Sequence, residues 1–304
     1  MRLRSGFGLV AVGVLMATVT ACGDDDPAAT AAGPEDGMRI ASFDFAESEL
    51  LAEMYAQVVE STGTPVVRLG PVGPREIVAP ATQQDLIDLV PEYLGTGLQF
   101  SGAMETNPDT QSALSDFNDV LEPLGLVALD AAPAEDKNVF AVNAERAQQE
   151  GWEAISDLHQ LRGEGRFGGP PECQDRALCL VGLREVYALQ FAEFVPQPSL
   201  VFTAEALRRD EIDVGLMFST AAELVAFDLA VLEDDRGLQP AENIVPIMRR
   251  DALDRWGPEV ADSLNAMSAE LTTRELRILN VEVGNGEPVE VVAGRWLTER
   301  DLVG

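Results

Sequence analysis

The chain has 304 residues, and its 52 acidic and 21 basic residues give a formal net charge of −31 at pH 7. A chain with this balance lacks the basic stripe that meets nucleic-acid phosphates, which excludes nucleic acids as expected partners. Hydrophobic residues make up 46% of the chain, an ordinary share for a globular protein, so we interpret the acidity as a solvated surface. A weak attraction for cationic ligands would follow from the same charge.

The first 22 residues have the pattern of a bacterial lipoprotein signal, with a basic start at Arg2 and Arg4. The apolar run at 7–19 is too short to span a bilayer comfortably, and small residues precede Cys22. We expect Cys22 to become the lipidated N-terminal residue; an ordinary cleaved signal peptide with an incidental cysteine is the alternative. Residues 23–37 contain no large apolar side chain and are predicted to form a flexible tether. These features predict an exported protein anchored to the outer face of the cell membrane.

The remainder of the chain alternates between strand and helix patterns, which predicts an α/β fold with largely parallel sheets. Apolar runs bounded by turn residues predict strands at 38–42, 65–69, 86–90, 124–129, 139–143, 212–217, 229–233 and 244–248. Periodic apolar residues predict helices after residue 44 and at 75–84, 183–194, 203–209, 258–271, 273–281 and 288–298. The glycine-rich stretch at 163–171 lacks the lysine of a phosphate-binding loop and is predicted to be a surface loop.

The helix after the first strand has a predicted start and a predicted core face. Asp44 stands three residues before Glu47, the spacing of a capping box, and Gly63 is expected to end the helix. Its apolar residues share one face: Leu50, Leu51, Met54, Tyr55, Val58 and Val59.

The predicted strand at 86–90 directs attention to the residues that follow it. Pro91 is expected to break this strand, and Tyr93, Gly95 and Thr96 come directly afterwards. Ligands bind at the carboxyl ends of strands in α/β domains. This segment therefore brings an aromatic ring and a hydroxyl to a predicted binding site.

The chain contains one internal echo, D-L-I-D-L at 85–89 and D-E-I-D-V at 210–214. In each copy the second aspartate stands five residues before an aromatic ring, and a threonine follows the ring. The residues are Asp88, Tyr93 and Thr96 in the first copy and Asp213, Phe218 and Thr220 in the second. Two lobes of similar build around a shared cleft would produce this echo, and coincidence is the alternative.

Cys173 and Cys179 are expected to form a disulfide because an exported protein meets an oxidising compartment; two unpaired thiols are the alternative. The single histidine, His159, gives little support for a zinc site. The sequence has no nucleophile elbow, phosphate-binding loop or zinc-protease motif. We therefore expect neither an enzyme nor a cofactor or metal.

Several segments together resemble the substrate-binding proteins of glycine betaine/choline/proline ABC transporters, from about Ile40 to the C-terminus. Besides the segment at 85–100 they are S-F-D-F-A-E-S-E-L at 42–50, G-P-R-E-I-V at 73–78, I-S-D-L at 155–158, F-S-T at 218–220, L-E-D-D at 232–235 and L-T-T-R-E-L-R-I-L-N at 271–280.

This resemblance implies a two-lobe periplasmic-binding-protein fold of type II with the ligand cleft between the lobes. The first lobe would be discontinuous, at 38–137 plus 242–304, and the second would be 138–241. The implied function is capture of a quaternary-ammonium compatible solute, of the glycine betaine, choline or carnitine type, for ABC permease subunits in the membrane. The protein is expected to be a monomer. A different small cationic or aromatic ligand, or a sensory role, is the alternative.

The resemblance also assigns site residues. Quaternary ammonium groups cannot donate hydrogen bonds and are held by the faces of aromatic rings. The implied rings are Tyr93, Phe140 and Phe218, while the place of a usual fourth ring, near Ala241, has no aromatic. Other implied ligand contacts are Thr96 and Arg176 toward a carboxylate, Asn138 beside the second ring, and Thr220 after the third.

Two positions depart from the family pattern. Phe43 stands in place of a usual basic residue, and Asp44 in place of a usual asparagine. Both are predicted to lie at the ligand site, where each would lower the positive potential that a betaine carboxylate needs. We therefore expect a weaker preference for glycine betaine over choline than the resemblance implies.

Overall fold

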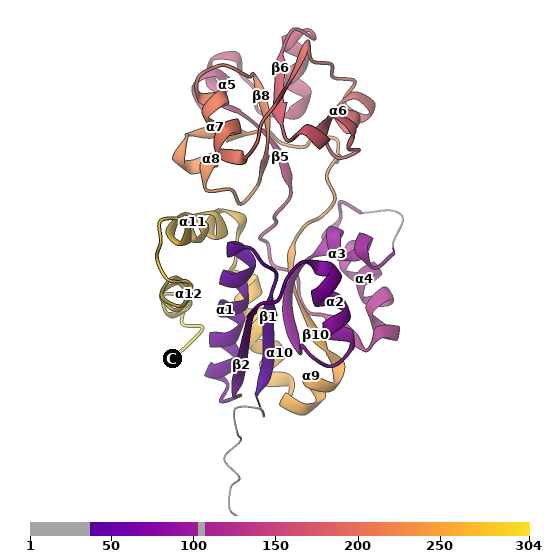
Figure 1. Ribbon diagram of the computed structural model, residues 1–304, viewed down its shortest axis with the longest axis vertical. Helices are drawn as coiled ribbons and strands as arrows, with labels where there is room; N and C mark the ends of the chain where they lie inside the picture. The colour runs from indigo at the N-terminus through magenta and orange to yellow at the C-terminus, as the bar shows by residue number, and fades with distance from the viewer. Residues whose placement is uncertain (1–36, 103–106) are drawn as a thin grey trace, which may run out of the picture. The chain divides into compact units, whose positions relative to one another are not determined.

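The computed structural model describes residues 37–102 and 107–304 and has two mixed five-stranded sheets with helices packed on them (Figure 1). The predicted signal, the lipidation site Cys22 and the tether, apart from Gly37, lie outside the described residues. No helix within the described ranges is long and apolar enough to cross a membrane.

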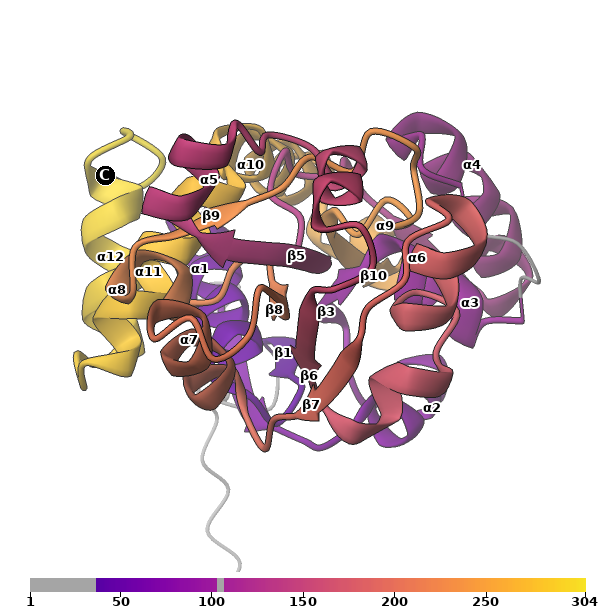
Figure 2. The same ribbon diagram turned by 90° about the horizontal axis from the view of Figure 1, so that it is seen from above.

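The first sheet has the strand order β2-β1-β3-β10-β4. Strand β1 is parallel to β2 and β3, and β10 is antiparallel to β3 and β4. Its strands are β1 (Met38–Ser42), β2 (Val66–Pro71), β3 (Leu89–Tyr93), β4 (Leu126–Ala128) and β10 (Ile244–Arg249). The helices of this half are α1 (Ala46–Ser61), α2 (Arg75–Gln83), α3 (Leu94–Phe100), α4 (Thr110–Leu121), α9 (Arg250–Trp256), α10 (Pro258–Glu270), α11 (Thr273–Gly284) and α12 (Val289–Thr298). Helices α10, α11 and α12 pack beside α1 (Figures 1 and 2).

The second sheet repeats this plan with the strand order β7-β6-β8-β5-β9. Strand β6 is parallel to β7 and β8, and β5 is antiparallel to β8 and β9. The strands are β5 (Asn138–Asn143), β6 (Arg166–Gly169), β7 (Glu193–Pro196), β8 (Val214–Phe218) and β9 (Leu229–Val231). The helices are α5 (Ala144–Glu150), α6 (Leu180–Val186), α7 (Leu200–Arg208) and α8 (Glu223–Ala226).

Each sheet has its own apolar core. The predicted face of α1 is fully buried in the core of the first sheet, together with residues of β1, β3 and β10. Alternate residues of β5 enter separate clusters, Phe140 and Val142 in one and Val139 and Ala141 in the other. The second sheet therefore buries apolar side chains on both faces, as the alternation of a strand requires.

Two segments connect the sheets and run beside each other. Glu135 forms an antiparallel bridge with Asn243, and the Asp136 amide donates to the Glu242 carbonyl at 3.0 Å. The predicted lobe boundaries at 137/138 and 241/242 fall within these connections and remain a prediction.

Strand β3 corrects the prediction that Pro91 breaks a strand. Pro91 lies inside β3, opposite Pro246 of β10. The Pro246 carbonyl accepts from the Leu129 amide, so the polar groups of this residue face β4 and not β3. Pro91 and Pro246 therefore face each other at a position of the ladder where no N–H···O bond between them is needed. Proline can occupy a central strand at such a position, although it has no N–H to donate.

The glycine-rich stretch at 163–171 also differs from the prediction, because it contains β6, a strand between β7 and β8. A Cβ on Gly168 would come within 2.4 Å of the Ile212 Cδ1 atom. A larger residue would make the Ile212 side chain shift, so close packing favours glycine here, although glycine weakens the strand pattern in the sequence.

The predicted helix at 183–194 ends much earlier, at Val186. Ala188 has a φ of 54°, which turns the chain out of the helix, and β7 begins at Glu193. The sheets are also mixed rather than largely parallel, since β10 and β5 each run against both of their neighbours.

The predicted capping box at the start of α1 does not form. The N-cap is Phe45, which has no side-chain capping bond, and Asp44 is exposed. Glu47 instead points toward Tyr93 and Asn280, with which it makes hydrogen bonds. Because its carboxylate accepts from Tyr93 and Asn280, Glu47 does not cap the helix.

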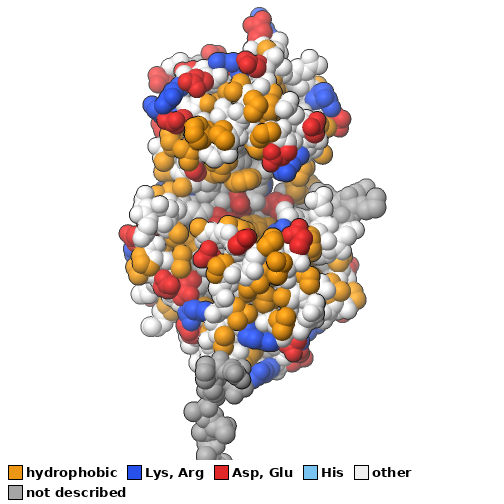
Figure 3. All heavy atoms as spheres, viewed as in Figure 1, with side chains coloured by type: hydrophobic (Ala, Val, Ile, Leu, Met, Phe, Trp, Pro, Cys, Tyr) orange, Lys and Arg blue, Asp and Glu red, His pale blue; other side chains and the backbone are white. Residues whose placement is uncertain are grey.

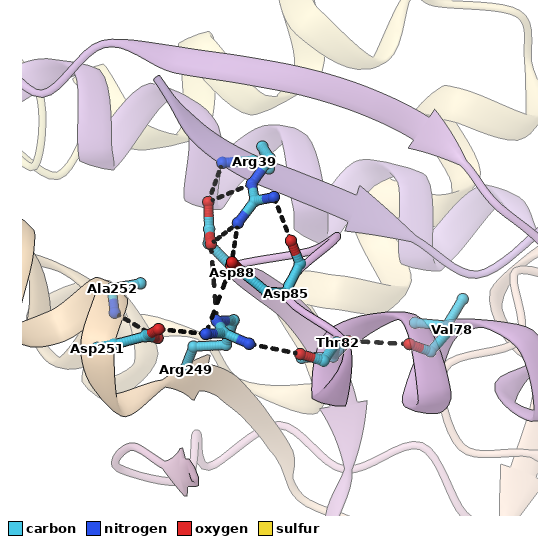
Figure 4. Close-up of polar contacts among 8 residues, drawn as sticks. All are labelled: Arg39, Val78, Thr82, Asp85, Asp88, Arg249, Asp251 and Ala252. Atoms are coloured by element: carbon cyan, nitrogen blue, oxygen red, sulfur yellow. Dashed lines mark hydrogen bonds and ion pairs between the residues drawn. The ribbon is translucent and has the colours of Figure 1, made fainter. Parts of the chain in front are cut away.

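The internal echo corresponds to a shared structure. Asp88 accepts hydrogen bonds from the Arg39 amide (2.8 Å) and Arg39 Nε (2.9 Å), and Arg249 lies on its other side (Figure 4). Asp213 accepts from the Arg166 amide at 2.6 Å and forms ion pairs with Arg166 and Arg146. Each aspartate thus stands directly before a central strand and joins arginines from both neighbouring strands or the helices that follow them.

Candidate functional site

A cavity of about 310 Å³ opens where the ends of β3 and β8 and the connecting segments meet. Figure 3 shows acidic side chains where this face of the molecule is hollowed. The cavity is lined by Phe45, Arg75, Tyr93, Thr96, Asp136, Lys137, Asn138, Arg176, Leu178, Phe218, Gln239, Pro240 and Glu242.

Tyr93 is the most firmly held ring of the cavity. It is the last residue of β3 and the N-cap of α3, and only 6% of its surface is exposed. Its hydroxyl donates to Glu47 Oε1 at 2.8 Å. Burial, with the nearby Glu47 charge, raises the pKa of the Tyr93 hydroxyl well above its usual range, so this group stays a donor.

Two more rings face the same space. Phe45 lies 6.0 Å from Tyr93 between ring centroids, and Phe218 is the last residue of β8. Phe45 is 41% exposed and Phe218 is 44% exposed, so both rings leave surface for a ligand to cover. The negative faces of such rings attract organic cations.

Two carboxylates line the cavity. Glu242 is nearly buried and accepts from the Thr96 amide (3.0 Å) and Thr96 Oγ1 (2.7 Å). Asp136 accepts from Thr220 Oγ1 at 2.8 Å. Burial raises the pKa of Glu242, and burial together with the Glu47 charge raises the pKa of Asp136 to about 7.

A glycine permits the contact between α3 and Glu242. A Cβ on Gly95 would lie 2.7 Å from the Ala241 carbonyl oxygen and 3.1 Å from Glu242 Oε1. Any larger residue at this position would push the second connecting segment away from Thr96.

The three cations of the lining are all engaged with carboxylates. Arg75 forms a bidentate pair with Glu92, at 2.8 and 2.7 Å, and lies over the ring of Phe43. Lys137 pairs with Glu135 at 2.7 Å. Arg176 is more available, because its pair with Glu172 is exposed and 3.6 Å long.

The predicted Cys173–Cys179 disulfide is present in the structure, and both cysteines are buried. It closes the short loop that contains Arg176 and Leu178. The Leu178 carbonyl accepts from Gln239 Nε2 at 3.0 Å, which ties this loop to the second connecting segment. The bridge therefore shapes one wall of the cavity.

The structure brings five of the predicted site residues into the cavity lining: Tyr93, Thr96, Asn138, Arg176 and Phe218. Phe140 lies outside it, since its ring is buried and meets Phe167 edge-on at 5.9 Å. It shares a strand face with Asn138 but stands two residues deeper, in the core.

The remaining predicted contacts also lie outside the lining. Phe43 is buried behind Phe45, with the two rings stacked 6.0 Å apart, and Thr220 is buried and bonded to Asp136. Asp44 is exposed on the surface. The expected lowering of positive potential by Phe43 and Asp44 thus loses its geometric basis.

Sequence reasoning missed Phe45, Asp136 and Glu242 as site residues. Phe45 could have been found, because it adjoins Asp44 in the quoted segment S-F-D-F. The two carboxylates had no distinguishing signal in a chain with 52 acidic residues.

Residues 36–299 match the family OpuAC, the substrate binding domain of ABC-type glycine betaine transport system. The glycine betaine-binding protein YehZ of Escherichia coli K12 is 25% identical over 268 residues, which cover 84% of this chain and 87% of the relative. The carnitine transport binding protein OpuCC of Listeria monocytogenes is 23% identical over 273 residues, 88% of each chain.

Solved structures show the same fold. A structure described as a glycine betaine/carnitine/choline ABC transporter superimposes with a TM-score of 0.81 at 23% identity, covering 87% of this chain and 99% of the other. Apo YehZ from Escherichia coli gives a TM-score of 0.79 at 23% identity, over 88% and 99%. The fold is that of periplasmic solute-binding proteins.

Proposed function

This chain belongs to the family of substrate-binding domains of ABC-type glycine betaine transport systems, and we propose that it captures a small quaternary ammonium solute in the cavity lined by Tyr93 and Phe218. It is a substrate-binding protein of a glycine betaine/carnitine-type ABC transporter. The observation that supports the site assignment is the gathering of three aromatic rings, the buried carboxylate of Glu242 and the partly buried carboxylate of Asp136 around one cavity.

The rings divide the binding between them. Tyr93 is fixed by its bond to Glu47 and offers a preformed face, whereas Phe218 and Phe45 are exposed and lose water when a ligand covers them. A cation over a desolvated ring gains about 0.5–2 kcal/mol. Because methylated ammonium groups have no N–H to satisfy, the rings suit them better than a cavity lined by acceptors alone.

Capture would use the two connecting segments as a hinge. These segments pair with each other through backbone bonds between 134–136 and 242–244, so they can bend as one ribbon. Bending would bring Phe218 toward Tyr93 and exclude water from the ligand. The closed form would then present its surface to the permease in the membrane.

The cellular setting completes the proposal. The protein would be exported, anchored through a lipidated Cys22 and active as a monomer, and it would carry out no catalysis. An alternative within the same fold is a sensory role, or a different small cationic or aromatic ligand, because a fold does not determine a function.

The test is a thermal-shift screen followed by calorimetry, with choline, glycine betaine, carnitine and tetramethylammonium as probes. A true ligand raises Tm by mass action. Phe218→Ala should weaken binding about 3- to 30-fold, the equivalent of one cation–π contact. Phe202→Ala is the matched control, since Phe202 is 55% exposed on α7, away from the cavity lining.

The outcome decides between the candidates. Binding of at least one quaternary amine that depends on Phe218 supports the proposal. A protein that binds none of these probes, or binds them equally well as Phe218→Ala, would assign the cavity another ligand.

A further inference from the structure

The charges of the cavity are unequally partnered. Arg75, Lys137 and Arg176 each form an ion pair with a carboxylate. Glu242 and Asp136 form no ion pair among the described residues and accept only from neutral donors, although the charge of Arg75 acts on Glu242 and opposes the rise of its pKa. The unsatisfied charge of the lining is therefore negative.

A third carboxylate stands directly behind Tyr93. Glu47 is 8% exposed and accepts from the Tyr93 hydroxyl at 2.8 Å and from Asn280 Nδ2 at 2.6 Å. These donors are neutral, and no cation pairs with Glu47 in the described part of the chain. Glu47, Asp136 and Glu242 are hereafter the three unpaired carboxylates.

No cation forms an ion pair with Asp136 among the described residues. The negative groups facing it are Glu47 of α1 and Glu242 of the second connection, with Glu135 beside it in the chain and the neutral Tyr93 at the end of β3. Lys137 pairs with Glu135, and Arg75 pairs with Glu92. Arg277 of α11 donates to the Ser219 carbonyl at 2.6 and 2.9 Å, a neutral acceptor that leaves its positive charge in place.

Carboxylates that lie close together in a partly buried cavity without a paired counter-ion are harder to ionise, because ionising all of them costs desolvation and mutual repulsion. The direction of the pKa at each of the three agrees, since burial raises it for Glu47, Asp136 and Glu242. A permanent cation placed among them would supply the missing charge and favour their ionised forms.

Resting on the proposed function, we propose that the three unpaired carboxylates select an organic cation that has no carboxylate of its own, and that its capture expels a proton. The O–H bond of a cavity carboxyl group breaks, the proton passes to the solvent buffer, and the carboxylate that remains balances the ligand's charge. A zwitterion such as glycine betaine would add its own carboxylate to the negative charge already in the cavity. Arg176, whose pair with Glu172 is weak, is the cation of the lining most available to bind that carboxylate.

The experiment is calorimetry of choline binding at pH 7 in two buffers of different ionisation enthalpy, which counts the protons released. We expect roughly half a proton per choline, because a group titrating near pH 7 is about half protonated there. The choline Kd should fall several-fold from pH 6 to pH 8, and choline should bind more tightly than glycine betaine at pH 8.

Two variants assign the protons. Asp136→Asn should reduce the proton release and flatten the pH dependence, and it retains an acceptor for Thr220. Glu242→Gln provides an independent test should the first variant fold poorly. Glu205→Gln is the matched control, an equal loss of charge at an exposed helix pair with Arg209.

The possible results separate the two proposals. Tight glycine betaine binding with no proton release, unchanged in Asp136→Asn and Glu242→Gln, overturns this inference and leaves the proposed function standing. Absence of binding to any quaternary amine overturns both. Proton release on choline binding that the two variants abolish supports both.

Discussion

Strand β3 of the first sheet and strand β8 of the second begin in the same way and end differently. Asp88 and Asp213 each stand before the strand, accept from the backbone amide of an arginine in the neighbouring parallel strand, and bond to that arginine's side chain. At the other end Tyr93 is 6% exposed and hydrogen-bonded, whereas Phe218 is 44% exposed.

The similarity extends to the surrounding arginines. Arg249 is the last residue of β10, and Arg146 lies in α5 directly after β5. Strands β10 and β5 hold equivalent places, antiparallel to β3 and β8. Asp85 and Asp210 both have positive φ angles, 62° and 53°. The charged ends therefore serve as matching scaffolds, and the differences that bear on ligands are confined to the cavity end.

The difference between the cavity ends of β3 and β8 indicates that the two halves contribute differently to the candidate site. The first half holds its ring and its carboxylates in place before a ligand arrives, through the Tyr93–Glu47 and Thr96–Glu242 bonds. The second half presents an exposed ring, Phe218, which would complete the site in the proposed closure. Five predictions test this contrast, from the largest expected effect to the smallest.

Asp88 and Asp213 should contribute about equally to the free energy of unfolding. Asp88→Asn and Asp213→Asn should each destabilise the protein by about 3 kcal/mol, since each leaves partly buried arginines without their carboxylate. Denaturant unfolding measures both, with Asp109→Asn as an exposed reference. A loss confined to one of the two variants would contradict their equivalence.

The stability of the protein at low pH should depend on Asp213 in the second half. Burial alone would raise the pKa of Asp213, but hydrogen bonds from Arg146 and the Arg166 amide lower it below its usual value. The resulting stability is present above the unfolded pKa and is lost as pH falls through the lower, folded value. Wild type should therefore lose stability below about pH 4, and Asp213→Asn should lose less over the same range.

The disulfide distinguishes the second half, because the first half has none among the described residues. Replacing Cys173 and Cys179 with serine should cost about 2 kcal/mol, the chain-entropy value for so short a loop. Affinity should fall as well, because Leu178 loses its fixed place against Gln239. Denaturant unfolding and ligand titration of the same variant give the two numbers, and unchanged affinity would remove the loop from the site.

The unpaired carboxylates predict an unusual pH dependence for the ligand-free protein. Because the folded pKa of Asp136 is raised to about 7, its contribution to stability is full below the unfolded value and is lost as pH rises through 7. Tm should drop by at least about 2 °C from pH 5 to pH 8. Asp136→Asn should be flatter, and a wild-type Tm that rises over this range would contradict the assignment.

The smallest effects are expected from exchanging tyrosine and phenylalanine at positions 93 and 218. Tyr93→Phe removes one of the donors to buried Glu47 and should cost about 1 kcal/mol. Phe218→Tyr adds a hydroxyl at an exposed ring and should change stability by less than about 0.5 kcal/mol. Equal costs in unfolding experiments would mean that the two rings are held alike.

Much of the fold was predictable because apolar patterns dominate it. The strands near 38–42, 139–143 and 244–248 and the buried face of α1 follow from periodicity alone. Strand β6 was not predictable in this way, because its glycines weaken the strand pattern. The place of Gly168 is explained by its packing against Ile212, which is distant in the sequence.

The site was only partly predictable for a related reason. Tyr93, Thr96 and Phe218 follow strand ends, so their place could be inferred from topology. Asp136 and Glu242 lie on the connecting segments, and their burial depends on how two distant parts of the chain meet. Phe140 shows the converse, since a shift of two residues along β5, from Asn138 to Phe140, separates the cavity from the core.

The most direct test of the central claim is a crystal structure with arsenocholine, whose arsenic atom gives an anomalous signal. We predict one arsenic peak within about 6 Å of the ring centres of Tyr93 and Phe218, the range of cation–π contact. A peak in the separate apolar cavity near Phe100 and Phe117, or no peak at saturating ligand, would contradict the assignment of the site.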